Sequence, residues 1–175
     1  MRYAQILAAA AAVGLVPAIG GCGLIAFDVD QDLPEQTIQG NPLGGILPQA
    51  LGAATPLNVD LKSETQKRST GPASSANLSA LRFAATPHAM PSGNFDFVDE
   101  IHVFIDSPGS SLPKKEIANL APVPKGQTTI NLAVTPGIDL LPYINAGAEI
   151  TATATGRQPS QDFHFDGHVT ITVHI

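Results

Sequence analysis

Short stretches in which apolar and polar residues alternate recur along most of this chain. The clearest covers 168–175, where every odd-numbered residue is Val or Ile and every even-numbered residue is His or Thr. A period of two places successive side chains on opposite faces of a strand, so this stretch predicts a strand with one buried and one solvated face. Six further alternating runs lie at 25–30, 57–61, 78–84, 101–106, 128–134 and 149–155. The pattern therefore predicts about seven strands.

Turn-forming residues separate these runs, since the chain has 16 glycines and 15 prolines. Many short strands between turn signals are typical of two antiparallel sheets packed face to face. We therefore predict an all-β sandwich, either immunoglobulin-like or jelly-roll-like. The chain has no tryptophan and a single cysteine, so it lacks the Cys and Trp hallmarks of antibody domains. Helix is expected only over 140–145, between Asp139 and Gly147, and at most as one further short helix over 46–53.

Two connecting segments differ in character. Residues 40–56 contain no charged side chain and are rich in Gly, Pro, Leu and Ala. Such an apolar segment is expected to cover the open end of the core, because it would otherwise be exposed to water. Residues 63–77 are polar, with Gly71 and Pro72 among several Ser and Thr. This second segment is expected to be a flexible surface excursion without regular structure.

The N-terminus reads as an export signal. A basic residue, Arg2, precedes an uncharged stretch over 4–19 that is rich in Ala, Leu, Ile and Val, and the stretch ends in Ile19-Gly20-Gly21-Cys22. These residues resemble the lipobox of bacterial lipoprotein precursors. The resemblance implies that signal peptidase removes residues 1–21 as a signal peptide and that the sulfur of Cys22 carries lipid. Residues 22–175 would then form a single β-sandwich domain.

Two other interpretations of this segment fit less well. A retained transmembrane helix needs about 20 apolar residues, whereas this run is shorter, contains Pro17 and ends in two glycines. A plain secretory peptide would leave Cys22 as a free thiol, which cannot pair within the chain and is open to oxidation.

The lipid anchor has consequences for location. One acyl chain holds a protein weakly and two or more hold it firmly, so a Cys22 carrying several chains such as palmitate would be a durable membrane anchor. The residue after it is Gly23, not the Asp that retains many lipoproteins of this class at the inner membrane. The resemblance therefore implies a lipid-anchored protein of the cell envelope, at the outer rather than the inner membrane.

The domain that follows Cys22 is acidic. Residues 1–21 contain one basic residue and no acidic one, which leaves 8 basic and 15 acidic residues and a formal charge of −7. Nucleic acids and anionic lipid surfaces need clustered Lys and Arg. The composition therefore argues against a nucleic-acid partner, and no motif indicates a cofactor.

Alternating carboxylates suggest a calcium site. Asp28, Asp30 and Asp32 supply the hard oxygen ligands that Ca²⁺ prefers. An EF-hand loop starting at Asp28 would require Gly and Glu where Leu33 and Gln39 stand. Carboxylates at alternate strand positions are also about 7 Å apart, too far to share one ion unless a bend at 32–34 brings them together. A solvated strand face is the alternative interpretation.

Histidines suggest a zinc site. His164, Asp166 and His168 lie close in sequence, and Asp166-Gly167 reads as a turn that would place the two histidines on facing strands of a hairpin. Such a cross-strand pair can share Zn²⁺, with Asp166, Glu100 or His102 completing the shell. The alternative is that these are exposed histidines on the wet face of a sheet.

Enzyme signatures are missing from the sequence: it has no G-x-S-x-G, no H-E-x-x-H and no Gly-rich phosphate loop. We therefore expect a non-catalytic lipoprotein that binds a partner protein, a glycan or another envelope component through loops 40–56 and 107–125. The alternative is a metal-binding module or metal-dependent hydrolase built on His102, His164, Asp166 and His168. A lipid-handling sandwich is a third idea, and it would require an apolar cavity.

Overall fold

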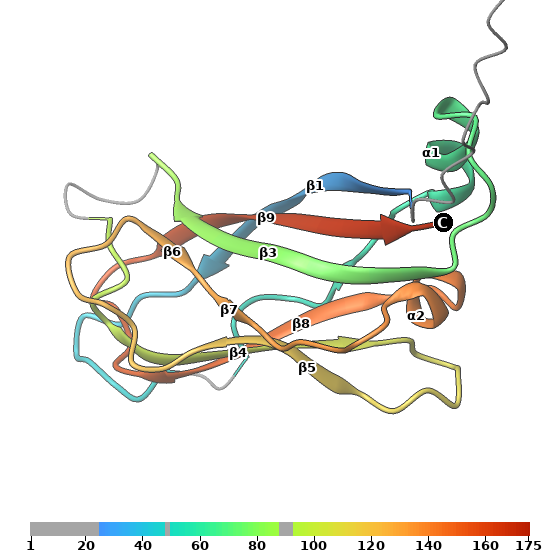
Figure 1. Cartoon of the computed structure of the whole chain (residues 1–175). Coiled ribbons are helices and arrows are strands. Elements are labelled where there is room, and N and C mark those ends of the chain that lie inside the picture. Colours follow the sequence, from blue (N-terminus) through green and yellow to red (C-terminus); the bar gives the residue numbers. More distant parts are fainter. Residues whose placement is uncertain (1–24, 48–49, 88–92) are drawn as a thin grey trace, which may run out of the picture.

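The computed structural model describes residues 25–47, 50–87 and 93–175, and these residues build two antiparallel sheets packed face to face (Figure 1). One sheet has four strands in the order β1-β9-β3-β6, and the other has five in the order β2-β8-β4-β5-β7. The strands are β1 (Ala26–Ile38), β2 (Thr55–Pro56), β3 (Ser75–Ala85), β4 (Val98–Asp106), β5 (Lys115–Leu120), β6 (Thr129–Asn131), β7 (Ala133–Val134), β8 (Glu149–Gly156) and β9 (Phe163–His174). The predicted all-β sandwich is confirmed.

The strand order is that of a jelly roll. β1 pairs with β9, β2 with β8, β3 with β6 and β4 with β5, all antiparallel. These four pairs are nested in sequence, as if one long hairpin had been folded over itself with its tip in the turn between β4 and β5. Two Greek keys arranged in this way distinguish a jelly roll from an immunoglobulin-like sandwich. The short strand β7 extends the five-stranded sheet beyond β5.

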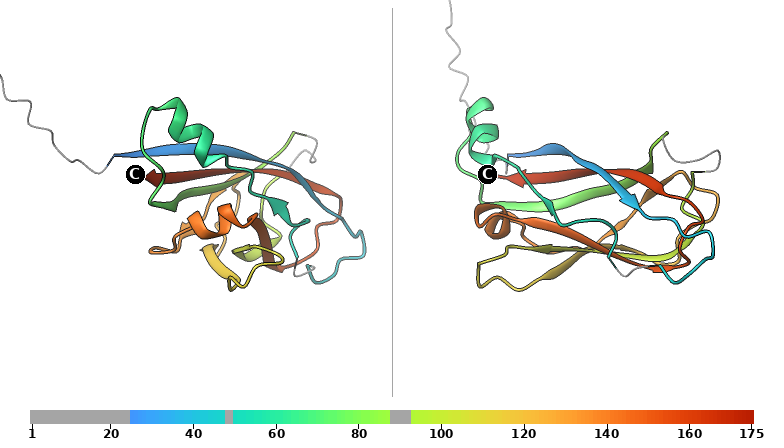
Figure 2. Two further views of the ribbon diagram at one scale, coloured as in Figure 1. Left: turned by 90° about the vertical axis from the view of Figure 1, so that its right-hand side faces the viewer. Right: turned by 180° about the vertical axis from the view of Figure 1, so that it is seen from behind.

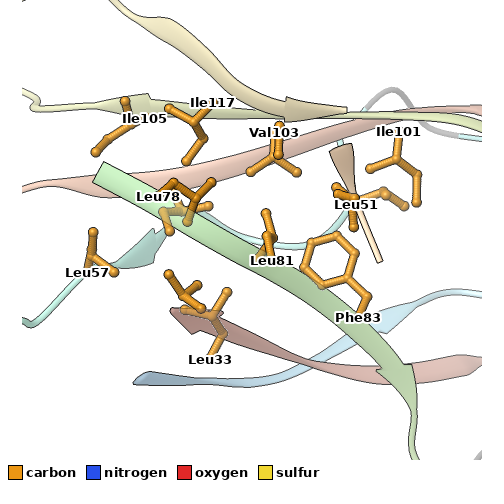
Figure 3. Packing of buried hydrophobic residues seen from close by; sticks show 14 of the residues in the cluster. Leu33, Leu51, Leu57, Leu78, Leu81, Phe83, Ile101, Val103, Ile105 and Ile117 are labelled. Atoms are coloured by element: carbon orange, nitrogen blue, oxygen red, sulfur yellow. The ribbon is translucent and has the colours of Figure 1, made fainter. Parts of the chain in front are cut away.

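The core lies between the sheets and is built by the alternation seen in the sequence. Val169, Ile171 and Val173 of β9 are fully buried, and so are Ile101 and Val103 of β4. Figure 3 shows the β4 side chains facing those of β3 across the interface. One end of the core is aromatic, because Phe83, Phe95, Phe163 and Phe165 contact one another edge to face or stacked. Burying these apolar surfaces is the main stabilising contribution to the fold.

Several strand predictions need correction. The run 57–61 is not a strand: Leu57 and Leu61 are buried, but β2 ends at Pro56 and Leu61 begins a helix. The run 128–134 is split between the sheets, since β6 pairs with β3 and β7 pairs with β5. Strand β5 was not predicted, because its sequence, KEIANL, does not alternate regularly and a bulge shifts its register against β4. The described residues form nine strands rather than about seven.

The two helices are short. α1 (Leu61–Lys67) was expected to be unstructured surface, yet Asp60 caps its N-terminus by accepting a hydrogen bond from the Ser63 amide. Hydrogen bonds from Lys67 and then from Arg68 hold the pKa of Glu64 below its ordinary value of 4.5. α2 (Leu141–Asn145) matches the predicted helix. Among the described residues, no helix is long and apolar enough to cross a bilayer.

The segment 40–56 covers one side of the core, as its composition predicted. Leu47 and Leu51 are buried, and their amides donate to the carbonyl oxygens of Gly156 and Ala152. Isolated bridges join Ile46 to Arg157, just after β8, and Ala50 to Thr153 of β8. Within the described part of this segment there is no helix, so the helix predicted over 46–53 is wrong there. Extended pairing with β8 takes its place.

The two ends of the sandwich are chemically distinct. β1 starts and β9 ends at the same end, beside α1, and we call this the proximal end (Figures 1 and 2). The loop 39–47 and the loop 157–162 between β8 and β9 lie together at the other end, which we call the distal end. The strand β1 connects the two ends directly.

Candidate functional site

Most of the candidate residues lie on one polar surface, the outer face of the β1–β9 pair. The residues Asp28, Asp30 and Asp32 of β1 alternate with partly or fully buried Phe27, Val29, Gln31 and Leu33. Register places Asp28 opposite Thr172, Asp30 opposite Thr170 and Asp32 opposite His168. The two strands therefore present a ladder of carboxylates against hydroxyl and imidazole groups.

Each aspartate is held by its cross-strand neighbour. The Thr172 hydroxyl donates to Oδ1 of Asp28 at 2.6 Å, and the Thr170 hydroxyl donates to Oδ1 of Asp30 at 2.7 Å. Asp32 Oδ1 lies 2.7 Å from Nδ1 of His168. Hydrogen bonds to carboxylates are stronger than neutral ones, so this ladder fixes the orientation of the three side chains. The hydroxyl partners were not singled out from the sequence, although the same alternation that predicted both strands contains them.

His168 lies between two carboxylates. Its Nε2 is 3.3 Å from Asp30 Oδ1, while its Nδ1 contacts Asp32. Further along β9, Nδ1 of His164 lies 2.9 Å from the Thr37 hydroxyl and 3.6 Å from Glu35 Oε1. Both rings lie against β1, so the histidines join the two strands on their solvated face.

The calcium hypothesis required a bend at 32–34, and β1 is irregular close to these residues. A bulge shifts the β1 register between Leu33 and Gln36. This irregularity does not gather the carboxylates, because each of the three aspartates is directed at its own partner on β9. The arrangement is the solvated strand face given above as the alternative.

The zinc hypothesis is wrong about the local fold. Asp166 and Gly167 lie in the middle of the continuous strand β9 and form no hairpin turn. His164 and His168 are thus four positions apart on one strand, which separates them by about 13 Å. His102 lies on β4 in the other sheet, where its Nδ1 is 3.0 Å from Glu116 Oε2. Over the ranges that the structure describes, no three His, Cys, Asp or Glu side chains are grouped to hold a metal ion.

Gly167 allows close packing in the core, although Asp166-Gly167 in the sequence predicted a turn. A Cβ at this position would lie 2.9 Å from Leu33 Cδ1 and 3.2 Å from Phe83 Cδ1. β9 is the strand between β1 and β3, and a side chain here would collide with inward residues of both neighbours. The glycine lets the two core side chains approach the β9 backbone.

A small apolar cavity lies between the sheets beside Gly167. It has a volume of about 30 Å³, and Leu33, Leu51, Phe83 and Phe165 are among its lining residues. A volume of this size holds a water molecule or two. It is too small for an acyl chain, so this cavity does not support the lipid-handling hypothesis.

The distal end carries the second candidate surface. Leu43 is 96% exposed and Ile46 is 88% exposed, the highest values among the large apolar side chains of the described residues. Four hydrogen bonds hold their loop to the loop 157–162: Gly40 N to Asp162 Oδ1 at 2.9 Å, Asn41 N to Pro159 O at 2.7 Å, Gln158 Nε2 to Gln39 O at 3.0 Å and Gln158 N to Gly45 O at 2.9 Å. Two aliphatic side chains are therefore presented to solvent on an anchored backbone.

The second predicted binding loop, 107–125, is not one loop. Residues 107–114 form the turn between β4 and β5 at the proximal end, and Lys115–Leu120 is strand β5. The segment 121–125 then lies at the distal end, where the Lys125 ammonium donates to the carbonyl oxygens of Asp96 and Val98. Only the loop 39–47 keeps the exposed apolar character expected of a binding loop.

The predicted lipid-attachment residue, Cys22, and the signal peptide over 1–21 lie outside the described residues. The predicted link to a membrane therefore stands on the sequence resemblance. No protein-family model matches this chain, and comparison with curated proteins finds no match.

Proposed function

We propose that this protein is a non-catalytic lipoprotein of the cell envelope, anchored through lipid on Cys22, whose β-sandwich binds a partner protein through its distal end. The anchor follows from the resemblance of Ile19-Gly20-Gly21-Cys22 to a lipobox. The observation that carries the binding role is the position of Leu43 and Ile46, which are exposed at the end of the sandwich opposite to the start of β1.

The geometry of the chain supports this arrangement. Ala26 is four residues after Cys22, so at most about 14 Å of extended chain would join the lipid to the sandwich. β1 has 13 residues and spans about 40 Å from the proximal to the distal end. A short tether at the proximal end would keep that end near the bilayer and direct the distal loop away from it.

The chemistry of the distal loop favours a protein partner over a glycan. The loop 40–47 has no charged side chain, and its two exposed large residues are aliphatic. Exposing such side chains to water is unfavourable, and burying them in an apolar pocket of a partner contributes about 1.5–3 kcal/mol each. The hydrogen bonds to 157–162 limit the entropy that the loop would lose on binding.

The anchor is tested by mass spectrometry and detergent partitioning. The mature wild-type chain should carry a lipid mass on the Cys22 peptide and enter the detergent-rich phase. A Cys22→Ser variant should remain uncleaved or enter the aqueous phase. An unmodified Cys22 sulfur in the wild-type chain would refute the anchor.

The binding surface is tested by photo-crosslinking in intact cells. A photoreactive residue at Leu43 should give a discrete protease-sensitive adduct, and the same residue at Ser110, exposed in the proximal turn, is the matched control. An Ile46→Glu substitution should remove the Leu43 adduct without lowering thermal stability. Equal adducts from both positions, or an adduct sensitive only to glycosidases, would refute a protein partner at the distal end.

A further inference from the structure

We propose that the free edge of β1 is a docking site for one additional β-strand, supplied by a partner whose strand carries Lys or Arg at alternate positions. This surface runs along 26–33 and differs from the distal loop. The inference does not depend on the lipid anchor. It rests on which backbone groups of β1 are directed away from β9, on the charge of β1 and on the hydrogen bonds that orient its aspartates.

One edge of β1 has no partner strand among the described residues. β1 is at the border of the four-stranded sheet, and within the described ranges it pairs only with β9. The Ile175 amide donates to the Ile25 carbonyl at 2.9 Å, and the register then runs without a shift to Leu33. Because hydrogen-bonded and non-hydrogen-bonded pairs alternate in an antiparallel ladder, odd-numbered residues of β1 bond to β9. The backbone groups of Asp28, Asp30 and Asp32 are directed to the free edge.

The same three aspartates carry the negative charge of this edge. Asp28, Asp30 and Asp32 lie on the outer face, and 25–39 contains no Lys or Arg. Across the three strands β1, β9 and β3 the sequence has one such residue, Arg82, which lies opposite His168 on the side away from β1. The free edge is therefore acidic at Asp28, Asp30 and Asp32, while the Arg68 guanidinium lies 4.3 Å over the ring of Phe27 at the proximal end of β1.

These carboxylates are already oriented by their contacts with β9. Each is held through Oδ1 by Thr172, Thr170 or His168 of β9. A carboxylate can accept about four hydrogen bonds, so capacity for another donor is left on the outer face. An incoming strand would meet preorganised charges rather than mobile ones.

The charge pattern also selects the partner. Two copies of this chain could pair their β1 edges antiparallel with their outer faces on the same side. The aspartates of one copy would then lie directly opposite aspartates of the other, and such like-charge pairs destabilise a sheet. Exposed edges are blocked against self-association in this way in many proteins. A strand with basic residues at alternate positions instead places each cation opposite a carboxylate, and its backbone completes the ladder. The bulge after Leu33 and the ring of Pro34 end the site at about eight residues.

The test uses the full-length chain in detergent and fluorescently labelled seven-residue peptides. One peptide alternates Lys with Val, and a second alternates Glu with Val. A third is the Lys peptide with N-methyl groups on the alternate backbone amides that would donate to β1. We expect the Lys peptide to bind at least tenfold tighter than either control. Replacing the three aspartates together (Asp28→Asn, Asp30→Asn, Asp32→Asn) should weaken binding by about tenfold, because three opposite-charge pairs are lost. Asn keeps an acceptor for the β9 hydroxyls, so the fold should be retained.

Hydrogen exchange locates the bound strand. In the free chain the amides of Asp28, Asp30 and Asp32 should exchange fast, and the Lys peptide should slow them, while the amide of Val29, which is directed at β9, should change little. Equal binding of the methylated peptide would show attraction by charge alone and would overturn the proposal. Failure of the Lys peptide to bind, or binding that leaves the three edge amides unprotected, would overturn it as well.

Discussion

Replacing Gly40 with Ala should loosen the distal loop that carries the proposed binding residues. A Cβ on Gly40 would overlap the backbone of Gln161, lying 2.6 Å from its amide nitrogen. The obstructing atoms belong to the main chain, so no change of side-chain rotamer can relieve the overlap. The φ angle of Gly40 lies outside the left-handed range, so the substitution tests contact and not backbone strain.

The magnitude follows from how the overlap can be relieved. If the loop 39–47 separates from 157–162, it loses four hydrogen bonds, each contributing about 0.5–1.5 kcal/mol, which sets an upper range of about 2–6 kcal/mol. If both loops shift together instead, overpacking costs about 1–3 kcal/mol. The protein will adopt the response that costs less free energy, so we expect the free energy of unfolding to fall by about 2 kcal/mol. For a chain of this size that lowers Tm by about 4–8 °C.

The assay is urea and thermal unfolding followed by far-ultraviolet circular dichroism, because the chain has no tryptophan to report by fluorescence. Gly147→Ala is the matched control. Gly147 has a φ of +83°, and a Cβ added to it would meet no atom within 4 Å, so its substitution costs only the left-handed strain of about 1–2 kcal/mol. Hydrogen exchange should rise at 157–162 in Gly40→Ala alone. A Gly40→Ala chain as stable as wild type would refute the steric argument.

Three further results are expected. Ile171→Ala should destabilise the fold by about 2–5 kcal/mol in urea unfolding, because Ile171 is fully buried in the central strand β9 and the change leaves a cavity; a loss below about 1 kcal/mol would contradict this burial. Ser107→Ala should cost about 0.5–1.5 kcal/mol, because the buried hydroxyl donates to the Tyr143 carbonyl at 3.1 Å; an unchanged urea midpoint would argue against that bond. Glu64 has a lowered pKa, so its contribution to α1 is present above pH 4.5 and is lost as pH falls through the lower folded pKa; NMR titration showing the Glu64 carboxyl at or above 4.5 would be inconsistent with its two hydrogen bonds.

The strands that alternate regularly were predictable because burial on one face leaves a period of two in the sequence. β9 and the part of β4 from Ile101 onward show this directly, with odd-numbered residues inside and even-numbered residues outside. β5 was missed because its bulge breaks the period. The segment 57–61 alternates for another reason: Leu57 and Leu61 are buried on either side of the entry into α1. Alternation in a segment indicates which residues are buried. Whether the segment is a strand also depends on the strands it pairs with, which lie elsewhere in the sequence.

The candidate site was predictable only in part. The residue types on the outer face of β1 and β9 were identified, but their pairing depends on register between strands about 140 residues apart in sequence. Asp166-Gly167 was misread for a related reason. Glycine is favoured both in turns and where neighbouring side chains pack closely against the backbone. At Gly167 the reason is close packing against Leu33 and Phe83, which lie on strands distant in sequence.

The nested pairing of strands also sets an order in time. β1 and β3 emerge from the ribosome long before β9, and both need β9 between them to form their sheet. The four-stranded half therefore stays open until about 170 residues have been synthesised, and contacts so distant in sequence close slowly. Until β9 is made, a nascent chain therefore cannot close its two sheets over a complete core.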